Sequence, residues 1–146
     1  LAQATRVEGQ SMEPNLHDNQ RLIIEKLSYR LHPPNRGDIV VLRRPMRQSD
    51  PLIKRVVGLP GETVSIHDVQ VYIDGEPLDE PYLTMTTWGV MQPQLIPEGH
   101  VFVLGDNRGS SNDSRAFGVV PVDDIIGRAW VRYWPLEDLT LFSAIP

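Results

Sequence analysis

GQSMEPNL, residues 9–16, places a serine at a bend shortly before an apolar strand pattern, RLII, at residues 21–24. Glycine tolerates backbone angles that other residues avoid, and proline fixes its own φ angle and lacks an N–H donor. We therefore expect a rigid bend at Ser11, with a backbone N–H that no strand ladder uses. A hydroxyl beside a free backbone donor suits an acyl-transfer nucleophile, because attack and oxyanion stabilisation occur in one small volume. Taken alone, a serine in a surface turn fits the same residues.

Segments rich in β-branched residues and separated by turns recur along the chain. Its 146 residues suit one domain, and 11 Gly with 13 Pro give more turn-forming residues than usual. The segments expected as strands are 5–9, 21–27, 38–42, 52–57, 62–66, 69–73, 100–105 and 125–134, with loops at 45–51 and 76–97. The sequence thus predicts a mainly β fold: a single catalytic domain, residues 1–146, of antiparallel, coiled or barrel-like sheet with little helix. A short hairpin and loop insertion is expected around residues 62–99, with Asp74-Gly75 as its turn.

The composition excludes several classes of function. The net charge is −5 and no long basic tract occurs, so nucleic acid is not an expected partner. With no cysteine, thiol catalysis and thiolate metal sites are excluded. The histidines lack metal-ligand spacing, so we expect neither a metal nor a cofactor. The chain has no apolar run of about 18 residues and begins at Leu1 without a signal pattern, so we expect it to be a piece of a longer protein.

Lys54 lies in the apolar strand pattern LIKRVV, residues 52–57. Side chains alternate along a strand, which puts Lys54 on one face with Leu52 and Val56, and Arg55 on the other. Such a lysine either extends its apolar stem to water or is a buried amine whose charged form is disfavoured. A buried amine could act as a base at neutral pH if its pKa fell by about 3 units from roughly 10.4.

GDNRGSSNDSR, residues 105–115, is dense in groups that hydrogen-bond their own backbone. A well-capped surface loop would have this composition. The segment follows a strongly apolar strand and precedes another apolar run at 117–120, so we expect its polar groups to be drawn inward. Asp113 and Arg115 can then pair and brace the loop, while a serine hydroxyl reaches a buried amine.

Four segments in fixed order resemble the motif boxes of type I signal peptidases. They are residues 9–16, 36–41 (RGDIVV), 54–62 (KRVVGLPGE) and 105–115, so the resemblance spans almost the whole chain. It implies a serine endopeptidase with a Ser–Lys dyad that removes signal peptides from exported preproteins. It also implies a membrane contact through a removed N-terminal anchor, with the catalytic domain on the extracytoplasmic side of the cytoplasmic membrane or on the lumen side of a thylakoid.

The resemblance assigns a role to each matched residue. Ser11 would be the nucleophile, Lys54 the general base that later returns a proton to the leaving amine, and Ser111 the group that orients the lysine. The residues expected to support the last loop are Asp113, Arg115 and Arg55. The residues expected to line a pocket for small substrate side chains, at the first and third positions before the cut, are Val7, Met12, Leu16, Val41 and Ile53.

Two departures from the family pattern affect these expectations. Gly9 stands where many relatives carry a serine whose hydroxyl helps to bind the oxyanion, which leaves the backbone N–H of Ser11 as the expected donor and Gly9 as an open position. Only residues 55–104 separate the lysine from the last box, so a large inserted subdomain has no room.

Three alternatives stay open at this point. A self-cleaving repressor-type peptidase also pairs a serine with a lysine, although residues 58–61 and 105–115 do not fit that class and no helix-turn-helix precedes Ser11. A non-catalytic β module could bind peptides by strand addition, although intact Ser11 and Lys54 argue against it. His17 is close to Ser11 in sequence, but a base is recognised by geometry, and residues this near around a proline bend need not face each other.

Overall fold

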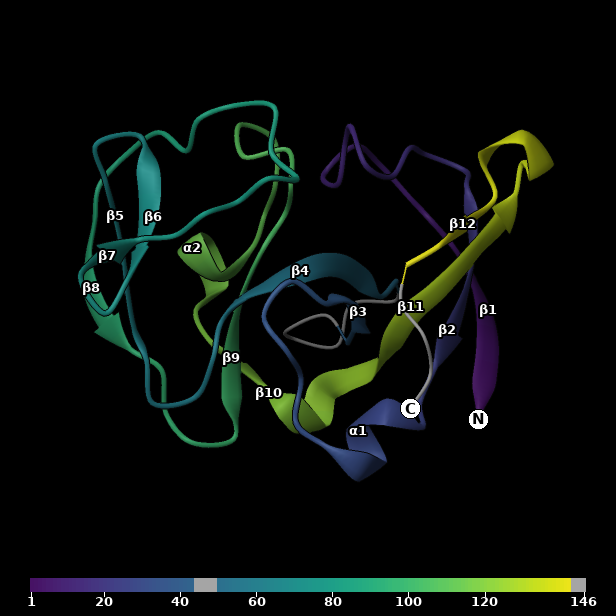
Figure 1. Ribbon diagram of the computed structural model, residues 1–146, viewed down its shortest axis with the longest axis horizontal. Helices are drawn as coiled ribbons and strands as arrows, with labels where there is room; N and C mark the ends of the chain where they lie inside the picture. Colours follow the sequence, from purple (N-terminus) through teal and green to yellow (C-terminus); the bar gives the residue numbers. More distant parts are fainter. Residues whose placement is uncertain (44–49, 143–146) are drawn as a thin grey trace.

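Two antiparallel β-sheets form the framework of the computed structural model, which describes residues 1–43 and 50–142 (Figure 1). Strands account for 41% of the described residues and helices for 10%. The mainly β fold with little helix is therefore confirmed. Of the loop expected over residues 45–51, residues 45–49 lie outside the described part of the chain.

The larger sheet has eight strands and contains both ends of the described chain. In spatial order its strands are β1 (Ala2–Arg6), β2 (Arg21–Glu25), β11 (Ile125–Trp134), β3 (Ile39–Leu42), β4 (Leu52–Gly58), β9 (His100–Leu104) and β10 (Val120–Pro121), with β12 (Thr140–Leu141) paired to β11. Within the described residues β1 has a neighbour on one side only, so its outer edge is open.

The smaller sheet comes from a single stretch of chain between β4 and β9. Its strands, in spatial order, are β7 (Glu76–Pro77), β6 (Gln70–Ile73), β5 (Thr63–His67) and β8 (Met91–Leu95). The turn between β6 and β7 has φ angles of 51° at Asp74 and 82° at Gly75, the left-handed pair that a tight hairpin turn requires. This sheet falls within the insertion expected over residues 62–99; that residues 1–146 act as one catalytic domain remains a prediction.

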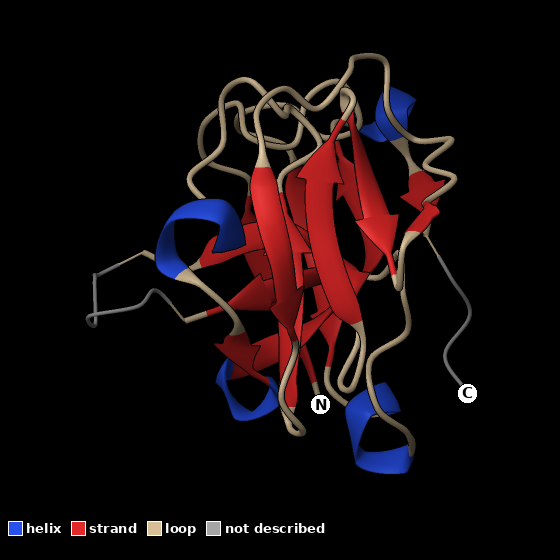
Figure 2. Ribbon diagram, turned by 90° about the vertical axis from the view of Figure 1, so that its left-hand side faces the viewer, coloured by secondary structure: helices blue, strands red, loops and turns tan. Residues whose placement is uncertain are grey.

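Several local expectations were wrong. The first strand covers Ala2–Arg6 rather than residues 5–9, because residues 9–16 form the bend itself. The segment 76–97, expected as loop, contains β8, which pairs along β5 although its burial pattern is almost fully exposed. Short helices occur outside the expected strands: α1 (Ser28–Leu31), α2 (Ser114–Phe117), η2 (Val122–Asp124) and η3 (Leu136–Asp138). Figure 2 shows the short helices around the margins of the strands. None of the described helices is long and apolar enough to span a membrane.

An ion pair ties two of the sequence boxes together at the junction of the sheets. The Arg36 guanidinium donates to both carboxylate oxygens of Glu62 at 2.6 Å, and to the Val57 carbonyl at 3.0 Å. The hydrogen bonds from Arg36 lower the pKa of Glu62, and the N–H of Leu59 contributes to the same shift. Such forked pairs add geometric specificity to their energy. This contact fixes the turn that leads from β4 into the small sheet.

A continuous apolar cluster packs the two sheets against each other. It combines residues of the large sheet (Val57, Phe102 and Leu104) with residues of the small sheet (Val64, Ile66, Val71 and Ile73) and with Ile96. Phe102 is fully buried at 0% exposure. Its ring is therefore part of what holds the small sheet in place beside β4 and β9.

Replacing Phe102 with alanine should lower the free energy of unfolding by about 3–5 kcal/mol, because the substitution removes buried area and leaves a cavity. Urea unfolding followed by circular dichroism measures this change. The matched control is Leu136→Ala, since Leu136 is 75% exposed and should change the value by less than about 0.5 kcal/mol. Equal effects of the two substitutions would show that the sheets do not depend on this cluster.

Candidate functional site

Ser11 lies half-buried in a tight bend that follows β1. The Glu13 N–H donates to the Gln10 carbonyl at 3.2 Å, which closes the turn around the serine. Gly9, with φ at 82°, occupies the left-handed region, and its N–H donates to Asp18 Oδ1 at 2.8 Å. The rigid bend expected from the sequence is therefore present, and it is held by backbone and carboxylate contacts on both sides of the hydroxyl.

Lys54 is buried in β4, with only 3% of its surface exposed. It lies opposite Val40 in the antiparallel register, and Val40 shares an apolar cluster with Val56 and Leu52. Lys54 therefore lies on the same face of β4 as Leu52 and Val56, as the sequence predicted. Its Nζ atom is 3.0 Å from Ser111 Oγ, a residue 57 positions further along the chain. A serine hydroxyl does reach a buried amine.

Gly105 leaves room for Ser111 and the Ser11 bend to approach each other. A Cβ atom at this position would lie 2.1 Å from Ser111 Oγ and 2.6 Å from the Ser11 carbonyl oxygen. Both groups therefore occupy the space that a side chain would fill. The Asn107 N–H donates to the same Ser11 carbonyl at 2.9 Å. The loop after β9 is in this way attached to the Ser11 bend on one side and to Lys54, through Ser111, on the other.

The Asp113 carboxylate holds the loop after β9 in place. This carboxylate, which has no exposed surface, accepts from Arg115 Nε at 2.9 Å, from Arg115 Nη2 at 2.8 Å and from the Gly105 N–H at 3.0 Å. Burial by itself raises the pKa of Asp113, but hydrogen bonds from Arg115, Gly105 and the Ser111 hydroxyl outweigh it and hold the pKa below its usual value. The pairing of Asp113 with Arg115 expected from the sequence is present.

The Ser111 hydroxyl is oriented by this carboxylate. Because the Ser111 hydroxyl donates its hydrogen bond to the Asp113 carboxylate, the Ser111 oxygen is left to accept from the Lys54 amine. A neutral amine that donates one N–H to Ser111 keeps its lone pair available for another proton. The chain from Asp113 through Ser111 to Lys54 is thus chemically suited to hold a base.

Arg55 extends from the opposite face of β4. It forms a forked pair with Asp106, from Nε to Oδ1 at 2.8 Å and from Nη2 to Oδ2 at 2.6 Å, and donates to the Gly37 carbonyl at 2.9 Å. Asp106 follows β9 and is fully buried. Arg55 therefore joins the lysine strand to the last loop, in the manner expected of a supporting residue.

The five residues predicted to line a substrate pocket all belong to one apolar cluster. They are Val7, Met12, Leu16, Val41 and Ile53, and their exposed fractions lie between 0% for Leu16 and 8% for Ile53. The structure thus brings them together next to the Ser11 bend. Whether they contact a substrate remains a prediction.

His17 is directed to other partners. Its Nδ1 atom lies 3.5 Å from Glu13 Oε2, and its backbone N–H donates to Gln20 Oε1 at 2.8 Å. Lys54, rather than His17, is the side chain that the fold buries beside Ser111.

Sequence reasoning missed three groups that support the site. Asn15, Glu80 and Tyr82 contact residues of the motif boxes through hydrogen bonds and ring stacking. Asn15 lies inside the first box, where its spacing from Ser11 could have indicated it. Glu80 and Tyr82 lie in the segment expected as a plain loop, and no local pattern marks them.

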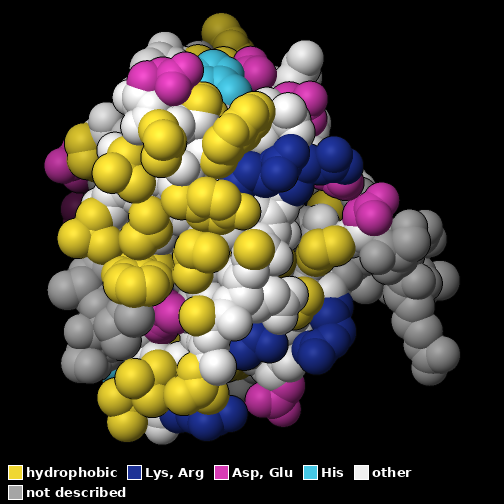
Figure 3. Space-filling model, turned by 90° about the vertical axis from the view of Figure 1, so that its right-hand side faces the viewer, with side chains coloured by type: hydrophobic (Ala, Val, Ile, Leu, Met, Phe, Trp, Pro, Cys, Tyr) yellow, Lys and Arg dark blue, Asp and Glu magenta, His cyan; other side chains and the backbone are white. Residues whose placement is uncertain are grey.

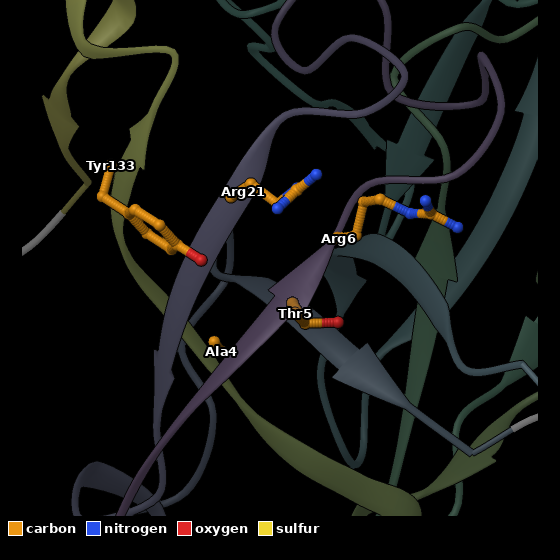
Figure 4. Close-up of a pocket in the computed structure, with 5 residues that line it drawn as sticks. All are labelled: Ala4, Thr5, Arg6, Arg21 and Tyr133. Carbon is orange, nitrogen blue, oxygen red and sulfur yellow. The ribbon is translucent and has the colours of Figure 1, made fainter.

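The outer part of the large sheet carries other surface features. Apolar side chains gather on the face near β1 and β12 (Figure 3), and those most exposed along the C-terminal hairpin are Trp134, Leu136, Leu139 and Leu141. A hollow of about 320 Å³ beside β1 and β2 is lined by Ala4, Thr5, Arg6, Arg21 and Tyr133 (Figure 4). None of these residues was predicted for the site.

A mainly β fold in which a buried lysine amine contacts a serine hydroxyl is typical of serine hydrolases that work with a lysine rather than a histidine. The family described as "Signal peptidase, peptidase S26" matches residues 1–134. The chain belongs to this signal peptidase family, which confirms the resemblance of its motif boxes and the expectation of a serine endopeptidase.

Individual relatives agree with this assignment. The chain is 45% identical over 149 residues to "Signal peptidase I" of Leptolyngbya laminosa, covering 95% of this chain and 72% of the relative. It is 39% identical over 145 residues to "Signal peptidase I" of Bacillus caldolyticus, covering 90% of this chain and 79% of the relative. The crystal structure of a signal peptidase I from Enterococcus faecalis V583 is 37% identical with a TM-score of 0.59, covering 66% of this chain and 97% of that one.

Replacing Asp113 with asparagine should lower the free energy of unfolding at pH 7 by about 2–3 kcal/mol, because a charged acceptor of several buried hydrogen bonds is lost. A carboxylate whose pKa is lowered on folding stabilises the fold above its unfolded value of 3.8, and this contribution is lost as the pH falls through the folded value. The difference between the two proteins should therefore shrink below pH 3.8. Urea unfolding at several pH values measures it, and a difference independent of pH would contradict the role of the charge.

Proposed function

We propose that this chain is the catalytic part of a peptidase that removes signal peptides from exported preproteins, with Ser11 as nucleophile and Lys54 as general base. The observation that carries the proposal is the buried Lys54 amine, 3.0 Å from Ser111 Oγ, with Ser111 and the Ser11 backbone close together at Gly105, in a chain of the signal peptidase family. Burial disfavours the charged form of an amine, and a base has to be neutral before it can accept a proton.

The first half of the reaction is acylation. Ser11 Oγ attacks the scissile carbonyl carbon while its proton passes to Lys54 Nζ. Lys54 then gives this proton to the nitrogen of the leaving chain, the C–N bond breaks, and the mature protein departs with a new N-terminal amine. The signal peptide stays attached to Ser11 as an ester.

The second half is hydrolysis of that ester. A water molecule attacks the acyl carbon and gives its proton to Lys54. The bond to Ser11 Oγ breaks, and the serine regains its proton from the lysine. The negative oxygen that forms in both halves needs fixed donors, for which the backbone N–H of Ser11 is our candidate. Gly9 brings no hydroxyl to this position, so any second donor is supplied elsewhere.

The substrate is proposed to bind as an added strand. The outer edge of β1 is open within the described chain, and β1 leads directly into the Ser11 bend. An edge strand offers unpaired backbone groups to an extended peptide, and alternate side chains of that peptide then point to the same side. The apolar cluster of Val7, Met12, Leu16, Val41 and Ile53 would form the floor beneath two of them.

The cellular setting is part of the proposal. Signal peptides meet their peptidase at a membrane, so the catalytic domain would act on the extracytoplasmic side of the cytoplasmic membrane, or on the lumen side of a thylakoid. An N-terminal anchor outside this chain would hold it there. The chain covers 72% of the Leptolyngbya relative and 79% of the Bacillus relative.

Ser11→Ala and Lys54→Ala should each lower kcat at least a thousandfold, and the double variant should be no worse, because the two residues act as one unit. Lys54→Arg should be equally inactive, since a guanidinium does not give up its proton. Ser111→Ala should lose about ten- to a hundredfold. Cleavage of a purified preprotein, with the new N-terminus identified by mass spectrometry, measures these effects.

The matched control for these variants is Ser110→Ala, because Ser110 is an exposed neighbour in the same loop. It should cleave at the wild-type rate. Retained cleavage by Ser11→Ala would exclude the proposed nucleophile.

Substrate side chains at the first and third positions before the cut should have to be small. A phenylalanine at either position should lower kcat/KM at least a hundredfold, whereas one at the second position should be tolerated, because alternate residues of a strand face opposite sides. Synthetic peptides that differ only at these positions measure the preference. Undiminished turnover of the bulky peptides would refute the assignment of the pocket.

A further inference from the structure

Residues 78–88, which belong to the connection between β7 and β8, reach from the small sheet to the proposed catalytic residues. Figure 1 shows this connection extending from the small sheet towards the loop that follows β9. The Glu80 carboxylate, only 5% exposed, accepts from Arg108 Nη2 at 2.5 Å and from Nη1 at 3.1 Å. Arg108, whose side chain is fully buried, also donates to Thr87 Oγ1 and the Gly105 carbonyl, both at 2.9 Å. This connection is therefore fastened to the loop that carries Ser111.

Tyr82 lies at the centre of the connection. Its hydroxyl donates to Glu80 Oε2 at 2.7 Å, and its ring lies beneath the Arg55 guanidinium, 3.9 Å from the ring centroid. Burial, together with the neighbouring Glu80 carboxylate, raises the pKa of Tyr82, so the hydroxyl stays protonated and continues to donate. A desolvated cation over an aromatic face is held more firmly than an exposed one.

The same tyrosine also contacts the Ser11 bend. Its backbone carbonyl accepts from Asn15 Nδ2 at 2.9 Å, and Asn15 Nδ2 donates its other hydrogen to Asp106 Oδ2 at 2.8 Å. Asn15 is four residues beyond Ser11. Its own carbonyl accepts from Arg132 Nη1 at 2.8 Å, which ties it to β11.

These contacts close into a ring of four residues from four segments. Asn15 binds Asp106, Asp106 binds Arg55, Arg55 stacks on Tyr82, and Tyr82 accepts from Asn15. Asn15 lies in the bend that contains Ser11, and Arg55 is the neighbour of Lys54 in β4. A closed ring restrains the distance between these two segments more strongly than either contact alone, because breaking one side leaves buried polar groups without partners.

We propose that Tyr82 is a positioning residue that holds the Ser11 bend and the Lys54 strand in register from the small sheet. This inference rests on the proposed function, since it concerns the alignment of the same two residues. Tyr82 acts through Arg55 and Asn15 and does not itself exchange a proton with the substrate. Small displacements of reacting groups have large effects on rate. Loss of the stacking between Tyr82 and Arg55 opens this closed set of contacts. It should therefore lower kcat and leave KM nearly unchanged.

The experiment compares three variants with the wild-type chain on one synthetic peptide that spans a signal-peptide cleavage site with alanine at the first and third positions before the cut. Tyr82→Leu removes the stacking and should lower kcat at least tenfold, with KM within twofold. Tyr82→Phe keeps the ring over Arg55 and should stay within threefold of wild type. Tyr72→Leu is the matched control: Tyr72 stacks on His67 in the small sheet, and its loss should leave kcat within twofold.

A second measurement reports the contact without reference to activity. The unfolding free energies of wild type, Tyr82→Leu, Arg55→Met and the double variant form a double-mutant cycle. If the Tyr82 aromatic ring and the Arg55 guanidinium interact, the loss of unfolding free energy in the double variant should differ from the sum of the losses in the two single variants. A wild-type chain that fails to cleave the peptide would overturn the proposed function, even when the cycle shows coupling.

Three outcomes would overturn the positioning role alone, with the wild-type chain active. One is a kcat for Tyr82→Leu equal to that of Tyr72→Leu. Another is a rise in KM at constant kcat, which would make Tyr82 a substrate contact. The third is an equal loss in Tyr82→Phe, which would place the effect in the hydroxyl rather than in the stacked ring.

Discussion

The hydrogen bond from the Lys54 amine to Ser111 Oγ is the contact on which the rest of the site depends. It occurs in a nearly water-free position, where a charged amine is costly and a neutral one needs a partner for its N–H. Asp113 supplies the other half of the arrangement, because its carboxylate accepts the hydrogen bond of the Ser111 hydroxyl and leaves the serine oxygen to accept from the lysine. A lysine can thus replace the histidine and aspartate of other serine hydrolases.

The two sheets contribute to this site in different ways. Lys54 lies in β4 of the large sheet, Ser111 lies in the loop after β9, and Ser11 lies in the bend after β1. The small sheet is packed against it by an apolar cluster around Phe102 and sends residues 78–88 back to the catalytic segments. The small sheet therefore supports the site through these contacts.

Part of the site could be predicted from the sequence, because it lies in compact boxes with fixed residue types. The face of the strand that carries Lys54, the contact of a serine hydroxyl with its amine and the pairing of Asp113 with Arg115 follow from such local patterns. The catalytic roles of Ser11, Lys54 and Ser111 follow from the resemblance of the boxes and remain predictions. The strand β8 could not be predicted, since its pairing with β5 outweighs its polar composition and Pro93. Tyr82 and Glu80 could not be predicted for a related reason. Their partners, Arg55 and Arg108, are 27 and 28 residues away along the chain, and contacts at that range produce no periodic pattern in the local sequence.

The protonation state of the Lys54 amine is the most direct test of the account. Selective labelling of lysine with ¹³C and ¹⁵N, with the half-buried Lys26 as the second lysine signal and Lys54→Met to assign the first, allows the titration of Lys54 to be followed by NMR. We expect the Lys54 amine to be neutral at pH 7. A Lys54 amine that carries a proton at pH 7, with or without bound peptide, would contradict the account, because no base would then be present to activate Ser11.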